Sequence, residues 1–81
     1  MLNESADRVR KHIDLLTSAV ANDKVLMDLL QPEFDKFEHR TEPHNTYVVR
    51  MYIAHRNSHR KDTQLIVDLE WLLENSNDRE T

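Results

Sequence analysis

The sequence of 81 residues contains no cysteine and no glycine. Without cysteine the chain has no disulfide bond, no thiolate metal site and no cysteine nucleophile. Without glycine it lacks the phosphate-binding loop and the dinucleotide-binding turn, because both motifs need glycine where the backbone approaches the ligand closely. The same absence disfavours tight hairpin turns and therefore extensive β-structure.

Long apolar runs are also missing. No segment approaches the roughly 20 apolar residues that a membrane-spanning helix needs, and the first residues show no basic stretch followed by an apolar one. We therefore expect a cytoplasmic protein. A chain this short buries only about 60–65% of its unfolded surface, so a single bundle of helices would be marginal alone and would gain stability by pairing. We expect a homo-oligomer.

The clearest periodicity lies in the first 21 residues. Apolar side chains recur there at alternating steps of four and three, which places one narrow seam along a helix: Leu2, Ala6, Val9, Ile13, Leu16 and Val20. This spacing predicts a helix from about residue 3 to residue 21. The positions beside the seam, such as Ser5, His12 and Arg10, offer no complementary charge pairs, which favours a bundle over a two-stranded coiled coil.

Four places interrupt the helical pattern: Asn22-Asp23, Pro32, Pro43 and the stretch 57–62. Asp23 is a good N-cap for a second helix. Pro32 either kinks that helix or lies in the first turn of a separate short one. Thr41 or Glu42 is the expected cap of the next helix, and Asp62 is the expected cap of the last one.

The segment 46–54 is apolar on nearly every helical face and rich in β-branched and aromatic residues. It is therefore either a buried helix or a strand, and the strand would require pairing between two chains, because no second strand of similar quality exists. We expect the helix. The fold class predicted is all-α, a three- or four-helix bundle with antiparallel neighbours. The single domain spans residues 1–75, and a polar tail frays over 76–81. The predicted core consists of Ile13, Leu16, Leu30, Phe34, Met51, Leu69 and Leu72.

The last predicted helix has a broad apolar stripe formed by Leu65, Ile66, Leu69, Leu72 and Leu73. Val67 and Trp71 lie off this stripe and, being four residues apart, are neighbours on a different face. An exposed tryptophan beside a valine is typical of a patch that binds a partner protein. The alternative is that another helix of the same chain covers both side chains.

Charge is unevenly distributed in a chain whose net charge is −4. Residues 39–61 contain five cations and one acid, a net charge of +4, whereas residues 62–81 contain six acids and one cation, a net charge of −5. This separation favours antiparallel packing of the last two helices, or head-to-tail contact between two chains. The alternative is that these are ordinary solvated helix faces.

Two histidines are weak candidates for a metal site. His55 and His59 are four residues apart, the spacing at which two imidazoles on one helix can bind one ion. The residues between them include no glutamate to act as the base of a zinc protease, and neighbouring cations oppose a further cation. We expect neither a metal nor another cofactor.

The basic segment allows a second function, the binding of a nucleic-acid backbone, with Arg50, Arg56, Arg60 and Lys61 as phosphate contacts. The acidic chain as a whole opposes this by long-range repulsion. Serines lie in no glycine-flanked turn and carboxylates are scattered, so we expect no enzyme. The leading hypothesis is a small helical protein-interaction or regulatory module, homodimeric, that binds another protein.

Overall fold

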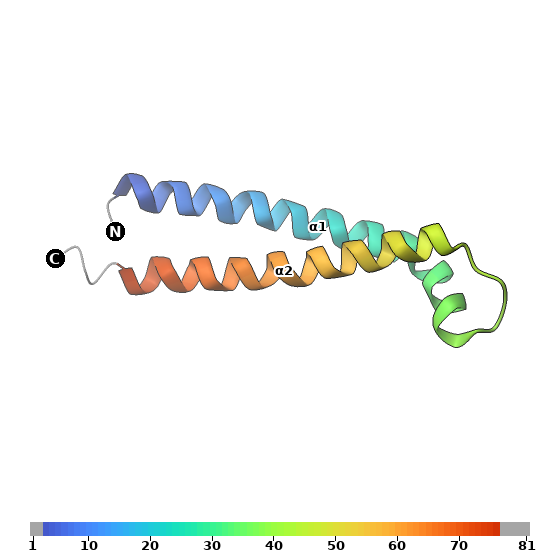
Figure 1. The fold of residues 1–81 in the computed structure, drawn as a ribbon. Coiled ribbons are helices and arrows are strands. Elements are labelled where there is room, and N and C mark those ends of the chain that lie inside the picture. Colours follow the sequence, from blue (N-terminus) through green and yellow to red (C-terminus); the bar gives the residue numbers. More distant parts are fainter. Residues whose placement is uncertain (1–2, 77–81) are drawn as a thin grey trace.

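The computed structural model describes residues 3–76 as two long helices packed side by side (Figure 1). Helix α1 spans Asn3–His39 and helix α2 spans Thr46–Ser76, and within the described residues neither a strand nor a third helix is present. The all-α prediction is confirmed, but the helices are fewer and longer than expected. The molecule is a helical hairpin measuring 62 × 16 × 14 Å.

The expected breaks at Asn22 and at 57–62 do not occur, because the alternating seam continues through them. On α1 half-buried or buried positions follow one another at steps of three and four: Ala6, Val9, Ile13, Leu16, Val20, Asp23, Met27, Leu30 and Phe34. On α2 the corresponding row is Val48, Tyr52, His55, His59, Asp62, Ile66, Leu69 and Leu73. Polar residues thus occupy seam positions in the middle of the hairpin, and each helix runs on.

Pro32 lies inside α1 and does not end it. A proline has no N–H to donate to the carbonyl four residues earlier, and its ring crowds that carbonyl, so the helix bends. In Figure 1 the end of α1 turns away from the line of the rest and passes to the other side of α2. The first of the two alternatives for Pro32, a kink, is therefore the one observed.

The turn between the helices, residues 40–45, is built without glycine. Arg40 has a φ of 53°, the left-handed conformation that usually follows a helix and that glycine adopts most easily. Helix α2 is capped by Asn45, whose Oδ1 accepts hydrogen bonds from the N–H groups of Tyr47 and Val48 at 3.0 and 3.3 Å. The expected caps, Thr41 or Glu42, were placed too early, and Asp62, expected to cap a last helix, lies inside α2.

Glu33 ties this turn to α1. Its carboxylate accepts a hydrogen bond from the backbone N–H of Asn45 at 3.2 Å and lies 3.3 Å from the Lys36 ammonium. The hydrogen bond from the Asn45 N–H is the largest cause that holds the pKa of Glu33 below its ordinary value of 4.5. Desolvation opposes this shift, and Lys36 adds to it. The start of α2 is therefore fixed to the end of α1 by one carboxylate.

The apolar core lies at the turn end of the hairpin. Phe34, Val49 and Tyr52 are buried, and Met27, Leu30 and Ile53 pack against them. The rings of Phe34 and Tyr52 stack with centroids 4.2 Å apart, and the Tyr52 hydroxyl donates to Gln31 Oε1 at 2.9 Å. Because residues 46–54 belong to α2, the strand alternative for this segment is wrong.

The remaining predicted core is less buried than expected. Phe34 is buried, but Leu72 is 37% exposed, and five predicted core residues are only half-buried: Ile13, Leu16, Leu30, Met51 and Leu69. A hairpin covers only one side of each helix, whereas the expected bundle would have covered two. The predicted frayed tail, apart from residue 76 in α2, lies outside the described residues.

Candidate interaction surface

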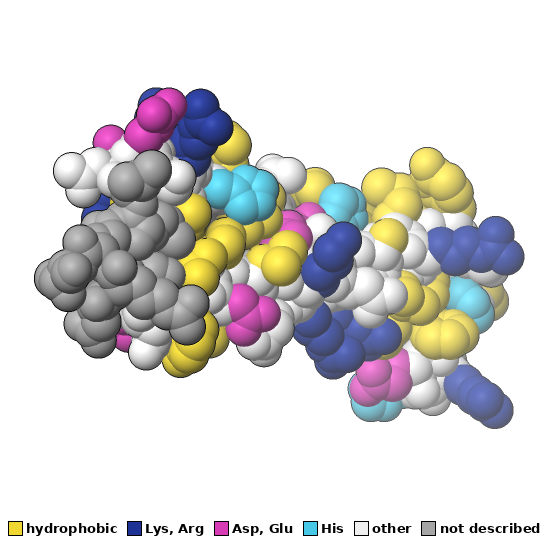
Figure 2. Space-filling view, turned by 60° about the vertical axis from the view of Figure 1, so that its left-hand side comes forward, with side chains coloured by type: hydrophobic (Ala, Val, Ile, Leu, Met, Phe, Trp, Pro, Cys, Tyr) yellow, Lys and Arg dark blue, Asp and Glu magenta, His cyan; other side chains and the backbone are white. Residues whose placement is uncertain are grey.

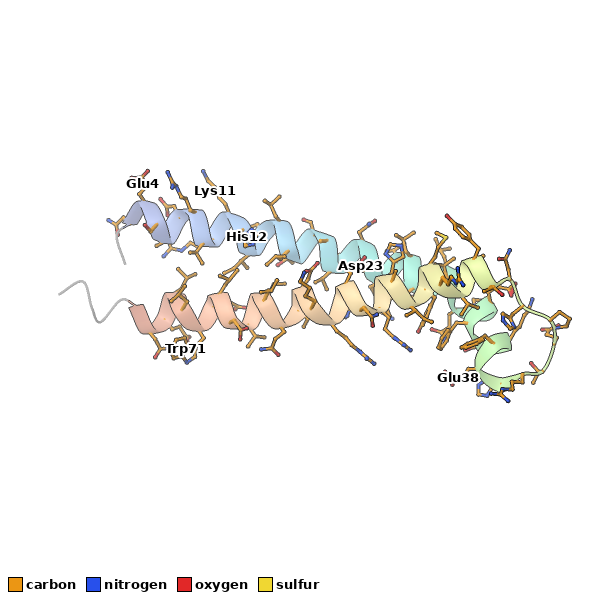
Figure 3. All side chains as sticks on the ribbon, in the orientation of Figure 1. Glu4, Lys11, His12, Asp23, Glu38 and Trp71 are labelled. Carbon is orange, nitrogen blue, oxygen red and sulfur yellow. The ribbon has the colours of Figure 1, made fainter. Side chains whose placement is uncertain are left out.

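Val67 and Trp71 lie on the outer side of α2, near the open end of the hairpin. In Figure 3 the Trp71 side chain points away from α1. Its exposed fraction is 63%, and that of Val67, one turn earlier, is 54%. Within residues 3–76 no other helix covers this pair, so the alternative in which another helix of the chain buries them is not observed.

Two glutamates complete this surface. Glu70 and Glu74 line the same shallow pocket as Val67 and Trp71, and we call these four residues the Trp71 patch. Residues 62–76 of α2 contain four acids and no lysine or arginine. The patch therefore combines an aromatic face with an uncompensated negative field, an arrangement suited to a lysine or arginine side chain beside an apolar one. The sequence indicated the apolar pair; the two glutamates were visible only as part of the acidic segment.

The cationic half of α2 presents three of its four predicted contact residues to solvent. Arg50, Arg60 and Lys61 are exposed. Arg56 is half-buried, with its guanidinium carbon 5.4 Å from the Phe34 ring centroid and 5.9 Å from that of Tyr52. Arg56 thus packs on the core, and its Nε is buried without a hydrogen-bond partner.

His55 and His59, the weak candidates for a metal site, lie in the seam between the two helices. His55 Nδ1 is 2.9 Å from Asp23 Oδ1, and the side chain of Asp23 is only 9% exposed. His59 is half-buried one turn further along α2. Among residues 3–76 no three histidine or carboxylate side chains are close enough to hold a metal ion together. Asp23, expected to be a helix cap, is instead the polar centre of the seam (Figure 3).

A set of large apolar side chains outside the Trp71 patch is also exposed, and the sequence did not indicate most of them. Leu15, Leu29 and Tyr47 are 70–71% exposed, and Leu65 and Leu72 are each 37% exposed. Figure 2 shows hydrophobic side chains open to solvent along the hairpin, among charged and histidine side chains. Leu65 and Leu72 are seven residues apart, and Leu15 and Leu29 are fourteen apart with Asn22 midway, so a seven-residue repeat in the sequence could have indicated these four leucines.

Comparison of the chain with family models, curated proteins and solved structures finds no match. Neither described helix is long and apolar enough to cross a membrane.

Proposed function

We propose that this protein is a non-catalytic, homodimeric interaction module that binds another protein through the Trp71 patch. The observation that carries the proposal is the exposure of Trp71 and Val67 side by side on the outer face of a long helix, flanked by Glu70 and Glu74. A surface aromatic that can become fully desolvated contributes more to binding than most contact residues. The cytoplasmic location expected from the sequence is part of this proposal.

The partner's chemistry follows from the patch. Two carboxylates beside an indole favour a partner segment that carries lysine or arginine next to an apolar side chain. The cation would lie over the indole face while the carboxylates neutralise it. Binding should therefore weaken as salt is raised, although the apolar contact would keep part of the affinity.

The experiment compares the effect on partner binding of replacing Val67, inside the Trp71 patch, with that of replacing an equally exposed valine outside it. The protein and three variants, Trp71→Ala, Val67→Ser and Val25→Ser, are immobilised and used to capture partners from the native host, and affinities for the purified partner are then measured. Val25 is the control because it is 57% exposed, close to the 54% of Val67, but lies on α1. Trp71→Ala should weaken binding about 30-fold or more, Val67→Ser should weaken it less, and Val25→Ser should leave it unchanged. Equal capture by all four proteins would refute the role of the patch.

Nucleic-acid binding is the second candidate, supported by the exposure of Arg50, Arg60 and Lys61 on one half of α2. The ring of Tyr52, in the same half of α2, is buried against Phe34 and is not available to stack on a base. Titration with DNA and RNA at two salt concentrations tests it, because phosphate contacts lose affinity steeply as salt rises. A steep salt dependence that disappears in an Arg60→Ala, Lys61→Ala double variant would favour this second function.

A further inference from the structure

One broad side of the hairpin carries two lines of residues at seven-residue spacing. On α1 the line is Leu15, Asn22 and Leu29, and on α2 it is Met51, Ser58, Leu65 and Leu72. Successive residues of a helix are about 100° apart around its axis. Around each helix axis, the line lies roughly 80–130° from the seam that faces the other helix, and the direction of this rotation is the same in both helices. Because the helices are antiparallel, turning in the same sense brings both lines to the same broad side. We call this side, together with the exposed Tyr47, the leucine face.

In a single chain no other element covers the leucine face within the described residues. The apolar core of the chain is also small, so burying this face would add much to its stability. Among residues 3–75 four apolar side chains are buried, those of Ala6, Phe34, Val49 and Tyr52, and none of them is fully buried. The radius of gyration is 17.8 Å, whereas a compact chain of this length would have about 12 Å. A second layer of helices on the leucine face would convert the two-helix hairpin into the four-helix architecture that such lengths commonly form.

We infer that the leucine face binds a second copy of this chain, turned end for end, to form an antiparallel four-helix bundle. This inference names the surface used by the homodimer in the proposed function, and it leaves the Trp71 patch on the outside of the bundle. In this arrangement α1 packs on the partner's α1 and α2 on the partner's α2, so every neighbouring pair of helices is antiparallel.

The hairpin's own register makes the face self-complementary. The contact between Asp23 and His55 sets Asn22 level with about residue 56 of α2. A two-fold axis at that level relates the two chains. It places a residue that lies a given number of positions before the level opposite the partner's residue that lies the same number of positions after it. On α1 it pairs Leu15 with Leu29, each seven residues from Asn22.

On α2 the same axis forms one large apolar pair and one small central pair, whereas Met51 falls opposite Lys61 and Leu72 opposite Arg40 in the turn. Tyr47 and Leu65 are each nine residues from position 56 and become partners, and the small residues Ala54 and Ser58, each two away, meet at the middle. Small side chains in the centre and large apolar ones towards both ends are what close approach of two helices requires. One operation therefore gives an apolar partner to each of the three most exposed apolar side chains of the described residues, Leu15, Leu29 and Tyr47.

The size of the face is sufficient for a stable dimer. A side measuring 62 Å by 16 Å projects about 1,000 Å², and a standard stable interface needs about 800 Å² from each partner. At the centre of the face the two Asn22 side chains would meet across the axis. A buried asparagine pair is a device that fixes register and number of chains.

A single cysteine tests the register, because the natural chain contains none. Facing helices whose axes are 8–10 Å apart bring Cα atoms on the two-fold to roughly 4–6 Å, within the range of a disulfide. Asn22→Cys should therefore form a disulfide-linked dimer rapidly under mild oxidation. Asn57→Cys is the matched control, an exposed asparagine at nearly the same level on α2 but outside the leucine face.

Sedimentation and tryptophan fluorescence complete the test. Leu29→Gln should raise the dimer dissociation constant about 100-fold, since symmetry removes two buried leucines, whereas Val25→Gln should not change it. Trp71, the only tryptophan, should keep the same emission on dilution through the dissociation constant. Equal cross-linking of both cysteine variants, or a shift of Trp71 emission on dimer formation, would place the contact elsewhere and overturn the inference.

A chain that stays monomeric at all concentrations would overturn both this inference and the homodimer part of the proposed function. It would leave partner binding at the Trp71 patch intact, because that part is decided by the Trp71 and Val67 variants. A dimer that persists in Leu29→Gln and dissociates in Trp71→Ala would refute only the inference.

Discussion

Replacing His55 by leucine should destabilise the hairpin through the carboxylate that it leaves behind. Asp23 is 7% exposed, its Oδ1 is 2.9 Å from His55 Nδ1, and its Oδ2 is buried without a partner. Removing the partner of a buried carboxylate leaves its charge uncompensated, and breaking a buried pair in this way costs about 3–5 kcal/mol. His55 is 27% exposed, so water can partly replace it and we expect the low end, about 3 kcal/mol.

A loss of about 3 kcal/mol is large compared with the stability expected of a chain of this length. At about 0.05–0.15 kcal/mol per residue, 81 residues correspond to a free energy of unfolding of roughly 4–12 kcal/mol. A loss of about 3 kcal/mol would lower the melting temperature by roughly 12–24 °C for a domain of this size. The assay is urea unfolding followed by circular dichroism, at one fixed protein concentration because dimer formation adds to stability.

The double variant Asp23→Leu, His55→Leu separates the cost of an orphaned charge from the cost of lost packing. With both polar groups gone and apolar side chains of similar size in the seam, its stability should equal or exceed that of the parent. The reasoning would be refuted if His55→Leu cost less than about 1 kcal/mol, or if the double variant were as unstable as His55→Leu.

The turn and the cap give three further predictions, all measured by unfolding at fixed concentration. Asn45→Ala should cost about 1 kcal/mol because it removes the cap of α2, whereas Asn57→Ala, in the exposed interior of α2, should be neutral or slightly stabilising. Arg40→Gly should stabilise by about 0.5–1 kcal/mol, because glycine adopts the left-handed φ of 53° without strain; no gain would mean that Arg40 is not strained. Because folding lowers the pKa of Glu33, its contribution to stability should be complete above the ordinary value of 4.5 and be lost as the pH falls through the lower pKa of the folded state. Glu33→Gln should therefore lose less stability on acidification than the parent, and identical pH profiles would refute this.

The helical character of the chain was predictable because it depends on local spacing. The seam from Ala6 to Val20 predicted the first part of α1, and the argument against a lone strand correctly favoured a helix for 46–54. Both conclusions needed only the period of the apolar residues and the satisfaction of backbone hydrogen bonds.

The number of helices was not predictable by counting apolar residues alone. Asn22-Asp23 has the composition of a helix stop, yet Asp23 continues the seam from Val20 to Met27. Its opposite neighbour, His55, is 32 residues away in the sequence, so the partner that makes a buried aspartate tolerable could not be identified locally. Pro32 was ambiguous for a related reason: whether a helix survives a proline depends on the packing of Phe34 beyond it.

The candidate surface was partly predictable. The offset of Val67 and Trp71 from the main stripe follows from helical geometry, and both side chains are exposed. The exposure of Leu15 and Leu29 was not predicted, because it depends on how many helices pack against α1. Because the chain forms two helices rather than three or four, more of the surface of each helix is exposed than the predicted bundle would have left.

The polar middle of the seam connects the stability of the hairpin to its assembly. A two-helix hairpin with a seven-residue repeat could slip by one repeat and still match most of its apolar positions. Such a slip would move Asp23 from His55 to either Asp62 or Val48, where its buried carboxylate would face a like charge or an apolar side chain. The Asp23 and His55 pair thus selects one register by making the neighbouring ones costly. In that register a single two-fold axis makes both pairings between chains, Leu15 with Leu29 and Tyr47 with Leu65. A slip would displace α1 relative to α2, so one axis could no longer make both pairings. The double variant Asp23→Leu, His55→Leu, which keeps its folding stability but no longer penalises the other registers, should therefore self-associate more weakly than the parent.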